Sequence, residues 1–383
     1  MKKILSSSLL VFLTLCFLIS PCARIAMAEN DVDISSRSGI LMDYASGEIL
    51  FAKNAETHLP VASMVKMMTI LIALEEYDAN NVTLDTMIST TENASGMGGS
   101  QVFIDPYVEY SFEDLLKSVI MASANDASVA LAEYFNGNEK SFVNRMNKRA
   151  KELGMTNTNY VNSTGLPAPE QYSCAKDSAI LMREILKHDL YHNYSSIWMD
   201  TLTHPSGRET ELVNTNKLIR YFEGCDGGKT GSTNEAGCCL TASAKRNDMR
   251  LISVIIGAEN SKTRFNESSL LLSYGFANFE NKLLVDISAP LKKVKVNKGK
   301  LDEVDVYGEE NFSVIVKKGD NATYETNMEI PDAVKAPLEN GDVVGKVVIT
   351  KEGSVIKEVN VIVKEGIKHS SYLDNFNKIV ENW

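Results

Sequence analysis

The feature that most constrains the fold of this 383-residue chain is a change of hydrophobic period along residues 35–282. Two short apolar runs within 39–53, joined by a glycine-containing turn, predict a pair of strands. Helical spacing then predominates over 62–188. Strand-like alternation returns in three segments: 224–231, 238–244 and 251–258. A last predicted helix lies near 262–280. Strands from both ends must therefore pair in one mixed sheet, with a helical lobe beside it and a cleft where the two meet, which predicts an α+β domain.

The composition changes near residue 283. Alternating apolar and polar residues recur in four runs separated by Gly and Asn turns: 291–296, 313–316, 343–349 and 355–363. This pattern predicts a small all-β domain at 283–366. The remaining residues, 367–383, place six apolar side chains on one helical face: Tyr372, Leu373, Phe376, Ile379, Val380 and Trp383. Such a helix suits either a membrane surface or a docking site on the protein itself.

The first 28 residues have the pattern of a secretory signal peptide. Lys2 and Lys3 are followed by an apolar run over 9–19, and the segment ends Ala26-Met27-Ala28. We expect cleavage after Ala28, which leaves 29–282 as the first domain of an exported, extracytoplasmic protein. The formal net charge of −11 disfavours nucleic-acid binding.

The cysteines and histidines predict neither a metal site nor a cofactor. Four cysteines follow the predicted signal peptide: Cys174, Cys225, Cys238 and Cys239. No Cys-x-x-Cys or Cys-x-x-His spacing and no His-Glu-x-x-His motif occurs after it, so structural zinc and a metallohydrolase are disfavoured. Export permits a disulfide from Cys225 to Cys238 or Cys239, and buried free thiols are the equal alternative.

A serine and a lysine at helical spacing form the first candidate site. Ser63 and Lys66 lie at the start of an apolar run that begins near Ala62. Positions i and i+3 share one face of a helix, so the hydroxyl and the amine can meet. A lysine can activate a serine only if its pKa is lowered, by burial or by a second cation. A Ser-x-x-Lys spacing occurs often by chance, so it indicates a catalytic site only if further motifs accompany it.

Two further motifs supply those neighbours. Ser123-Ala124-Asn125 falls between two predicted helices, where the side chains either project into the cleft or cap the second helix. Lys229-Thr230-Gly231 lies on a predicted strand preceded by two glycines. Glycines there allow a substrate backbone to approach, as in peptide recognition at a sheet edge.

Ser-x-x-Lys, Ser-x-Asn and Lys-Thr-Gly in this order resemble the motif set of penicillin-binding proteins and serine β-lactamases. Longer stretches are similar to the low-molecular-mass penicillin-binding proteins that are serine-type D-alanyl-D-alanine carboxypeptidases: 60–69, 123–127, 162–166, 226–237 and 249–257. The resemblance covers roughly 33–282 and implies a β-lactamase/penicillin-binding transpeptidase-like domain. Ser232 stands where the family often has His or Tyr, and Gly228 replaces a commoner apolar residue, which leaves substrate preference open.

The resemblance implies a role for each motif residue. Ser63 attacks the carbonyl between two D-alanines and forms an acyl-enzyme, with Lys66 as its base. Lys229 is the second cation that favours neutral Lys66. Ser123 relays a proton to the leaving amine, and Asn125 holds the substrate amide and orients Lys66.

The same resemblance implies the substrate-binding residues. Thr230, Gly231 and Ser232 form the strand segment that contacts substrate. The backbone N–H groups of Ser63 and Ser232 form an oxyanion hole. Thr230 and Arg264 bind the free terminal carboxylate, which restricts the enzyme to chain ends. By position alone, a surface ion pair of Arg264 is the alternative.

The implied substrate is a peptidoglycan stem peptide ending in D-Ala-D-Ala, and β-lactam antibiotics are implied as acylating ligands. Three alternatives stay open. A β-lactamase needs a glutamate for deacylation, and no Glu-x-x-Leu-Asn occurs between Ser123 and Lys229. A transpeptidase or endopeptidase would use the same acyl-enzyme. A non-catalytic wall-binding protein would be favoured by loss of a motif residue, and Ser63, Lys66 and Lys229 are all present.

Overall fold

A computed structural model describes residues 32–320 and 322–374. The predicted signal peptide 1–28 lies outside the described residues, and so do most positions of the predicted terminal helix. Of that helix's apolar face, Tyr372 and Leu373 are described, and their side chains are 96 % and 74 % exposed. Among the described residues, no helix is long and apolar enough to cross a membrane.

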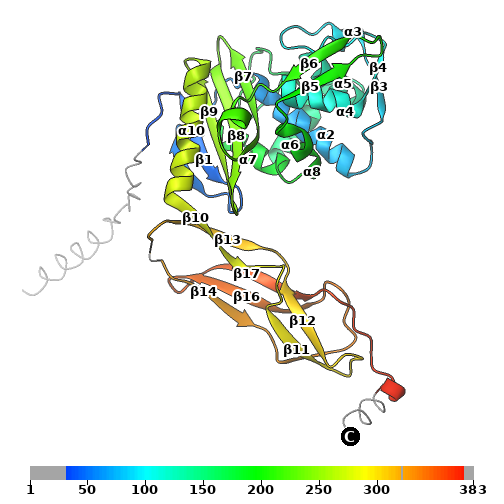
Figure 1. The fold of residues 1–383 in the computed structure, drawn as a ribbon, viewed down its shortest axis with the longest axis vertical. Coiled ribbons are helices and arrows are strands. Elements are labelled where there is room, and N and C mark those ends of the chain that lie inside the picture. Colours follow the sequence, from blue (N-terminus) through cyan, green and yellow to red (C-terminus); the bar gives the residue numbers. More distant parts are fainter. Residues whose placement is uncertain (1–31, 321, 375–383) are drawn as a thin grey trace, which may run out of the picture. The chain divides into compact units, whose positions relative to one another are not determined.

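A five-stranded sheet joins the two ends of the first domain, as predicted (Figure 1). Its strand order is β2-β1-β9-β8-β7, and all four pairings are antiparallel. The strands are β1 (Ser38–Asp43), β2 (Ile49–Lys53), β7 (Cys225–Thr233), β8 (Gly237–Arg246) and β9 (Met249–Ala258). The β1–β9 pairing closes the sheet across more than two hundred residues. β7 is left at one edge, which confirms an edge strand for the Lys-Thr-Gly motif.

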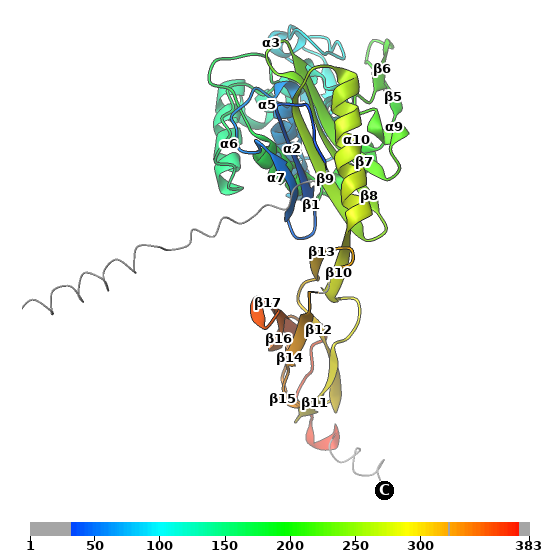
Figure 2. The ribbon, with the colours of Figure 1, turned by 90° about the vertical axis from the view of Figure 1, so that its left-hand side faces the viewer.

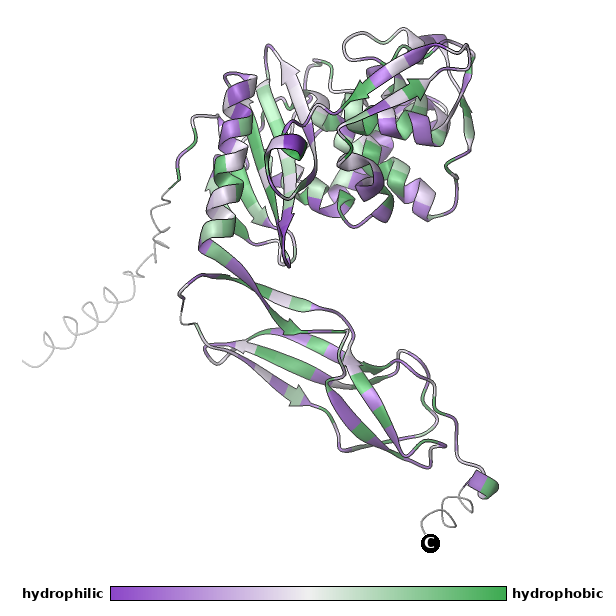
Figure 3. Ribbon diagram, in the orientation of Figure 1, coloured by the Kyte–Doolittle hydropathy of each residue, from purple (hydrophilic) through white to green (hydrophobic). Residues whose placement is uncertain are grey.

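Both faces of this sheet are covered (Figures 1 and 2). The long helix α10 (Ser261–Asn278) packs on one face, where Gly275 lets the helix approach Leu41 and Leu251. Ile40 and Ile252 belong instead to the core shared with the helical lobe. Burial on both faces explains why β1 and β9 have long apolar runs. Figure 3 shows these apolar runs along β9 and along the central strands of the C-terminal sheet.

The helical lobe contains the predicted helices, with two local refinements. The helix expected from Ala62 begins as a 3-10 turn, η1 (Ala62–Val65), and continues as α2 (Lys66–Asp78). The helix predicted before Ser123 is α4 (Phe112–Lys117) followed by a π-helical turn, η2 (Ser118–Ala122). The predicted break lies between η2 and α5, because Ser123 has a φ of 62°. The other helices are α5 (Asn125–Asn136), α6 (Glu139–Glu152) and α7 (Ala175–Ile185).

Two hairpins and three short helices were not predicted. The hairpins are β3 (Met87–Ser89) with β4 (Glu109–Ser111), and β5 (Met199–Thr203) with β6 (Glu209–Val213). The short helices are α3 (Glu92–Ser95), α8 (Asp189–Ser195) and α9 (Leu218–Tyr221). In β5 and β6 only Leu202 and Leu212 are buried, so their sequences lack the apolar alternation that marks a strand.

The region after α10 is all-β, as predicted. β10 (Phe279–Val285) pairs with β13 (Phe312–Lys317). The second sheet contains six strands: β14 (Tyr324–Glu329), β16 (Val343–Lys351), β17 (Ser354–Val363), β12 (Glu303–Gly308), β11 (Lys292–Asn297) and β15 (Ala333–Lys335). Its core consists mainly of valines. The expected boundary at residue 283 falls inside β10, which continues directly from α10.

Candidate active site

The nucleophile candidate Ser63 sits in the 3-10 turn that opens α2. In this geometry residues i and i+3 eclipse each other, so their side chains are brought close. Lys66 Nζ lies 3.0 Å from Ser63 Oγ, which confirms the predicted contact. Ala62, just before Ser63, has a φ of 48°, a backbone region that non-glycine residues rarely adopt. Strain of this kind is frequent beside catalytic side chains.

Lys66 is fully buried, and its amine nitrogen has two hydrogen-bond partners among the described residues. Besides Ser63, Nζ contacts the backbone carbonyl of Thr164 at 2.5 Å. Burial is the main cause that holds the pKa of Lys66 well below its usual value, and the charge of Lys229 adds to the effect. The negative charge of Asp126 acts in the opposite direction. The neutral amine that a general base requires is therefore favoured, with burial more important than the second cation.

A second serine–lysine pair joins the helical lobe to the edge strand. Lys229 Nζ, on β7, donates to Ser123 Oγ at 2.6 Å, and its other contact is the carbonyl of Thr230 at 3.2 Å. Burial, with help from the charge of Arg264, lowers the pKa of Lys229 to about 7. This lysine can thus hold or release a proton near neutral pH.

Asn125 does not orient Lys66 in this structure, contrary to the prediction. Its side-chain amide donates to the carbonyl of Gly98 at 2.5 Å, and its backbone N–H to that of Ser100 at 2.7 Å. The Oδ1 atom is buried and accepts no hydrogen bond from a described residue. The carbonyl of Thr164 contacts Lys66 instead. The segment 162–166 was part of the resemblance but had no predicted role, because every residue type has a backbone carbonyl and the sequence does not indicate which one contacts Lys66.

Two glycines let the backbone close around Ser63. A Cβ atom on Gly165 would lie 2.1 Å from the carbonyl oxygen of Ala62 and 2.9 Å from the Ser63 nitrogen. A Cβ atom on Gly231 would lie 2.5 Å from the carbonyl oxygen of Val61 and 3.1 Å from the same nitrogen. A larger residue would push the 162–166 segment away from the nucleophile if placed at Gly165, and β7 away from it if placed at Gly231.

A cavity of about 560 Å³ brings most of the predicted residues together. It is lined by Ser63, Ser123, Thr230, Gly231, Ser232 and Arg264, among others. Arg264 is 9 % exposed and forms no ion pair with any carboxylate of the described residues, so the surface ion pair considered above is wrong. Its guanidinium donates to the carbonyls of Gly231 and Cys239 at 3.1 and 3.3 Å, and its Nε is buried without a partner among described residues.

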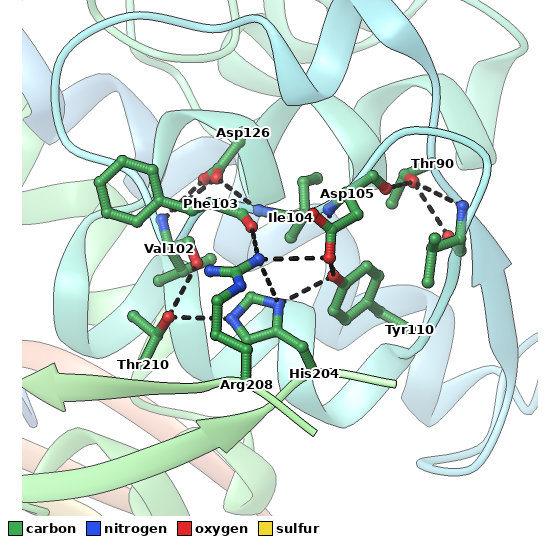
Figure 4. A network of polar contacts seen from close by, with 11 residues as sticks. Thr90, Val102, Phe103, Ile104, Asp105, Tyr110, Asp126, His204, Arg208 and Thr210 are labelled. Atoms are coloured by element: carbon green, nitrogen blue, oxygen red, sulfur yellow. Dashed lines mark hydrogen bonds and ion pairs between the residues drawn. The ribbon is translucent and has the colours of Figure 1, made fainter. Parts of the chain in front are cut away.

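A buried polar network holds the loop that contacts Asn125 (Figure 4). The Asp126 carboxylate accepts hydrogen bonds from the backbone N–H groups of Val102, Ile104 and Ala127. The fixed loop in turn supplies the carbonyls of Gly98 and Ser100 to Asn125.

The same network reaches the β5–β6 hairpin. His204 is buried between the Tyr110 hydroxyl and Thr210 Oγ1, each at 2.8 Å from a ring nitrogen. Arg208 contacts both His204 and Asp105. Burial and the charge of Arg208 lower the pKa of His204, which favours the neutral ring. Sequence reasoning gave these residues no role.

The described cysteines do not form the disulfide that export would permit. All four are free, and Cys238 lies beside the site, with its sulfur 3.2 Å from Ser232 Oγ. Burial raises the pKa of the Cys174 and Cys225 thiols to about 12.

Comparisons with known proteins agree with this geometry. Residues 25–260 match a peptidase family described as D-alanyl-D-alanine carboxypeptidase, and residues 279–369 match the C-terminal domain of penicillin-binding protein 5. The D-alanyl-D-alanine carboxypeptidase DacF of Bacillus subtilis is 36 % identical, and the alignment covers 100 % of this chain and 99 % of that protein. DacC of Escherichia coli is also 36 % identical, over 93 % and 90 % of the two chains. The crystal structure of penicillin-binding protein 5 from Haemophilus influenzae superposes with a TM-score of 0.71 at 33 % identity, covering 88 % of this chain and 99 % of that one.

Proposed function

Because this chain belongs to the D-alanyl-D-alanine carboxypeptidase family of serine peptidases, we propose that it removes the terminal D-alanine of peptidoglycan stem peptides through an acyl-enzyme on Ser63. One observation carries the assignment of residues: two serine–lysine pairs, Ser63 with Lys66 and Ser123 with Lys229, belong to one site beside an edge strand.

Acylation begins with proton transfer from Ser63 Oγ to Lys66 Nζ, which is buried and favours the neutral form. The oxygen then attacks the carbonyl between the two D-alanines. Lys229 carries a proton near neutral pH and passes it through Ser123 to the leaving amine. Terminal D-alanine departs, and water later hydrolyses the ester.

The developing oxyanion is held by the backbone N–H groups of Ser63 and Ser232. Support comes from the close packing at Gly165 and Gly231, which presses β7 and the 162–166 segment onto the turn that contains Ser63. These donors are fixed before the reaction, so little reorganisation is needed when charge develops.

Thr230 and Arg264 bind the free carboxylate of the leaving residue. The Arg264 guanidinium donates hydrogen bonds to backbone carbonyls of β7 and β8. It therefore stabilises the position of the edge strand and also contributes positive charge to the site. A buried guanidinium beside the strand favours a substrate that ends in a carboxylate.

We further propose that the protein is exported after loss of residues 1–28, and that residues 29–282 act at the outer face of the cytoplasmic membrane. Residues 283–366 would separate this domain from the 367–383 tail. The exposure of Tyr372 and Leu373 supports a membrane contact of the tail. Fractionation of cells expressing the full chain or a chain ending at residue 366 tests this: the shorter chain should leave the membrane fraction.

The decisive assay is D-alanine release from a pentapeptide by residues 29–383, beside Ser63→Ala and a penicillin-treated sample. Release should vanish in both controls, and penicillin should label the unmodified protein alone. Labelling of Ser63 without D-alanine release would point to a transpeptidase, and an unlabelled, inactive protein would refute the catalytic proposal.

A further inference from the structure

An extra residue interrupts the edge strand β7 just before the Lys-Thr-Gly motif. The register of β7 against β8 shifts by one residue between Cys225 and Gly227. Asp226 is therefore the additional residue of a β-bulge, a feature that bends a strand and changes the direction of the side chains that follow. Its carboxylate forms an ion pair with Arg250 of β9 at 2.7 Å, so the bulge is anchored to the sheet.

The bulge decides which face of the sheet Lys229 occupies. Lys229 pairs with Thr241 of β8, and Thr241 pairs on its other side with Val254, which belongs to the core shared with the helical lobe. Without the extra residue, Lys229 would pair with Leu240 instead. Because side chains alternate between the two faces of a sheet, Lys229 would then point away from Ser123. The contact between this lysine and Ser123 therefore depends on the bulge.

Two side chains of α8 hold the backbone of the bulge. A bulge locally disrupts the hydrogen bonds between two strands, so the affected peptide groups need other partners. The Tyr191 hydroxyl accepts a hydrogen bond from the N–H of Gly228 at 3.0 Å. Ser195, at the end of the same helix, donates through Oγ to the carbonyl of Asp226 at 2.5 Å. Both side chains are buried, so water does not compete for these bonds.

Asn216 completes this support, and two glycines make room for it. The buried amide of Asn216 donates to the carbonyl of Gly227 at 3.0 Å. A Cβ atom on Gly227 would lie 2.9 Å from the Tyr191 hydroxyl. A Cβ atom on Gly228 would lie 2.8 Å from the Asn216 amide nitrogen, and the φ of 145° at this glycine is one that other residues rarely adopt. The two glycines thus admit the supporting side chains to the strand.

We propose that the three side chains at the bulge, Tyr191 above all, position Lys229 for the reaction. None of the three lines the active-site cavity, so they act through the strand and not on the substrate. By holding the bulge, they keep Lys229 on the lobe side of the sheet, with its Nζ 2.6 Å from Ser123 Oγ. The inference rests on the proposed function, in which this serine–lysine pair delivers a proton to the leaving amine.

The substrate-binding end of β7 is held independently of the bulge. Thr230 and Gly231 continue the pairing with β8, and Arg264 donates to the Gly231 carbonyl at 3.1 Å. Loss of the support at the bulge should therefore disturb Lys229 more than the residues that bind the substrate carboxylate. In kinetic terms, kcat should fall while KM stays nearly constant.

The test is Tyr191→Phe, which removes only the hydroxyl that accepts the hydrogen bond from Gly228. For D-alanine release from a pentapeptide, kcat should fall by about 10-fold and KM should change by less than about 2-fold. Ser195→Ala removes a second bond at the bulge and should lower kcat in the same way. Tyr194→Phe is the matched control, because this hydroxyl of α8 donates to Glu113 and not to β7, and kcat should stay unchanged.

A double variant shows whether Tyr191 acts through Lys229. Tyr191→Phe alone should slow penicillin labelling of Ser63 by about 10-fold, because the β-lactam nitrogen also needs a proton. Added to Lys229→Met, the same substitution should slow labelling no further. The proposal is overturned if Tyr191→Phe leaves kcat unchanged, or if it slows labelling equally with and without Lys229. An unmodified protein that releases no D-alanine would instead refute the proposed function.

Discussion

The two serine–lysine pairs of this protein are built in different ways. Ser63 and Lys66 belong to one turn and meet because of local backbone geometry. Ser123 and Lys229 are 106 residues apart and meet only because the helical lobe packs against the sheet edge. Both lysines are buried: burial holds the pKa of Lys66 well below its usual value and lowers that of Lys229 to about 7. The local pair thus suits proton removal, and the assembled pair suits proton delivery and depends on the whole fold.

The largest expected effect tests the local pair. Lys66→Met keeps the shape of a buried chain but removes the base, so kcat/KM for D-alanine release should fall by at least about 1,000-fold. Penicillin labelling should slow to a similar extent, because both reactions begin at Ser63. Unfolding measured by circular dichroism is the control for an intact fold. Activity within 10-fold of the unmodified protein would exclude Lys66 as the base.

The second prediction concerns the assembled pair. Ser123→Ala removes the contact to Lys229 and interrupts the proton path, so kcat/KM should fall by about 100-fold. The decrease should be smaller than for Lys66→Met, since the nucleophile can still be activated. Stopped-flow measurement of the acylation rate distinguishes Ser123→Ala from Lys66→Met. If Ser123→Ala lowers kcat/KM more than Lys66→Met does, Ser123 and Lys229 do not act mainly in proton delivery to the leaving amine.

The third prediction uses pH. A protonated Lys229 is needed for delivery, so D-alanine release should decline as the pH rises through about 7. The nearby charge of Arg264 helps to lower this pKa, and Arg264→Gln should therefore move the decline to higher pH, by about half a unit. Lys245→Gln, at an exposed position of β8, serves as the control. A shift to lower pH would contradict the electrostatic explanation.

The smallest effect on catalysis is expected in the network that supports the assembled pair. In Asp126→Asn, an amide group would face backbone N–H donors and leave one unsatisfied, so the free energy of unfolding should fall by about 2 kcal/mol. D-alanine release should decrease only a few-fold, because the motif side chains stay in place. Urea denaturation measures the free energy of unfolding. The control Asp85→Asn, at an exposed position, should change neither the stability nor D-alanine release. Unchanged stability would show that the loop does not depend on this carboxylate.

The same difference between local and assembled structure explains what the sequence could predict. The Ser63–Lys66 contact follows from spacing alone, and the sheet built from both termini follows from hydrophobic periodicity. The Ser123–Lys229 contact followed only from resemblance to known proteins, because no spacing rule joins residues so far apart. The partner assigned to Asn125 was wrong, since side-chain direction depends on the 98–100 loop.

Burial was the other quantity that sequence could not supply. A second cation was expected to tune Lys66, whereas enclosure by the lobe is the larger influence.

The pairing of β1 with β9 has a consequence for how the protein comes into being. β1 can pair early with β2, but its other neighbour, β9, is synthesised about two hundred residues later, so no early portion of the chain can complete this sheet. Such a topology postpones folding until almost the whole domain is available. For the export proposed above, this delay would keep the polypeptide unfolded during its passage through a translocation channel, and the protein would become active only on the far side.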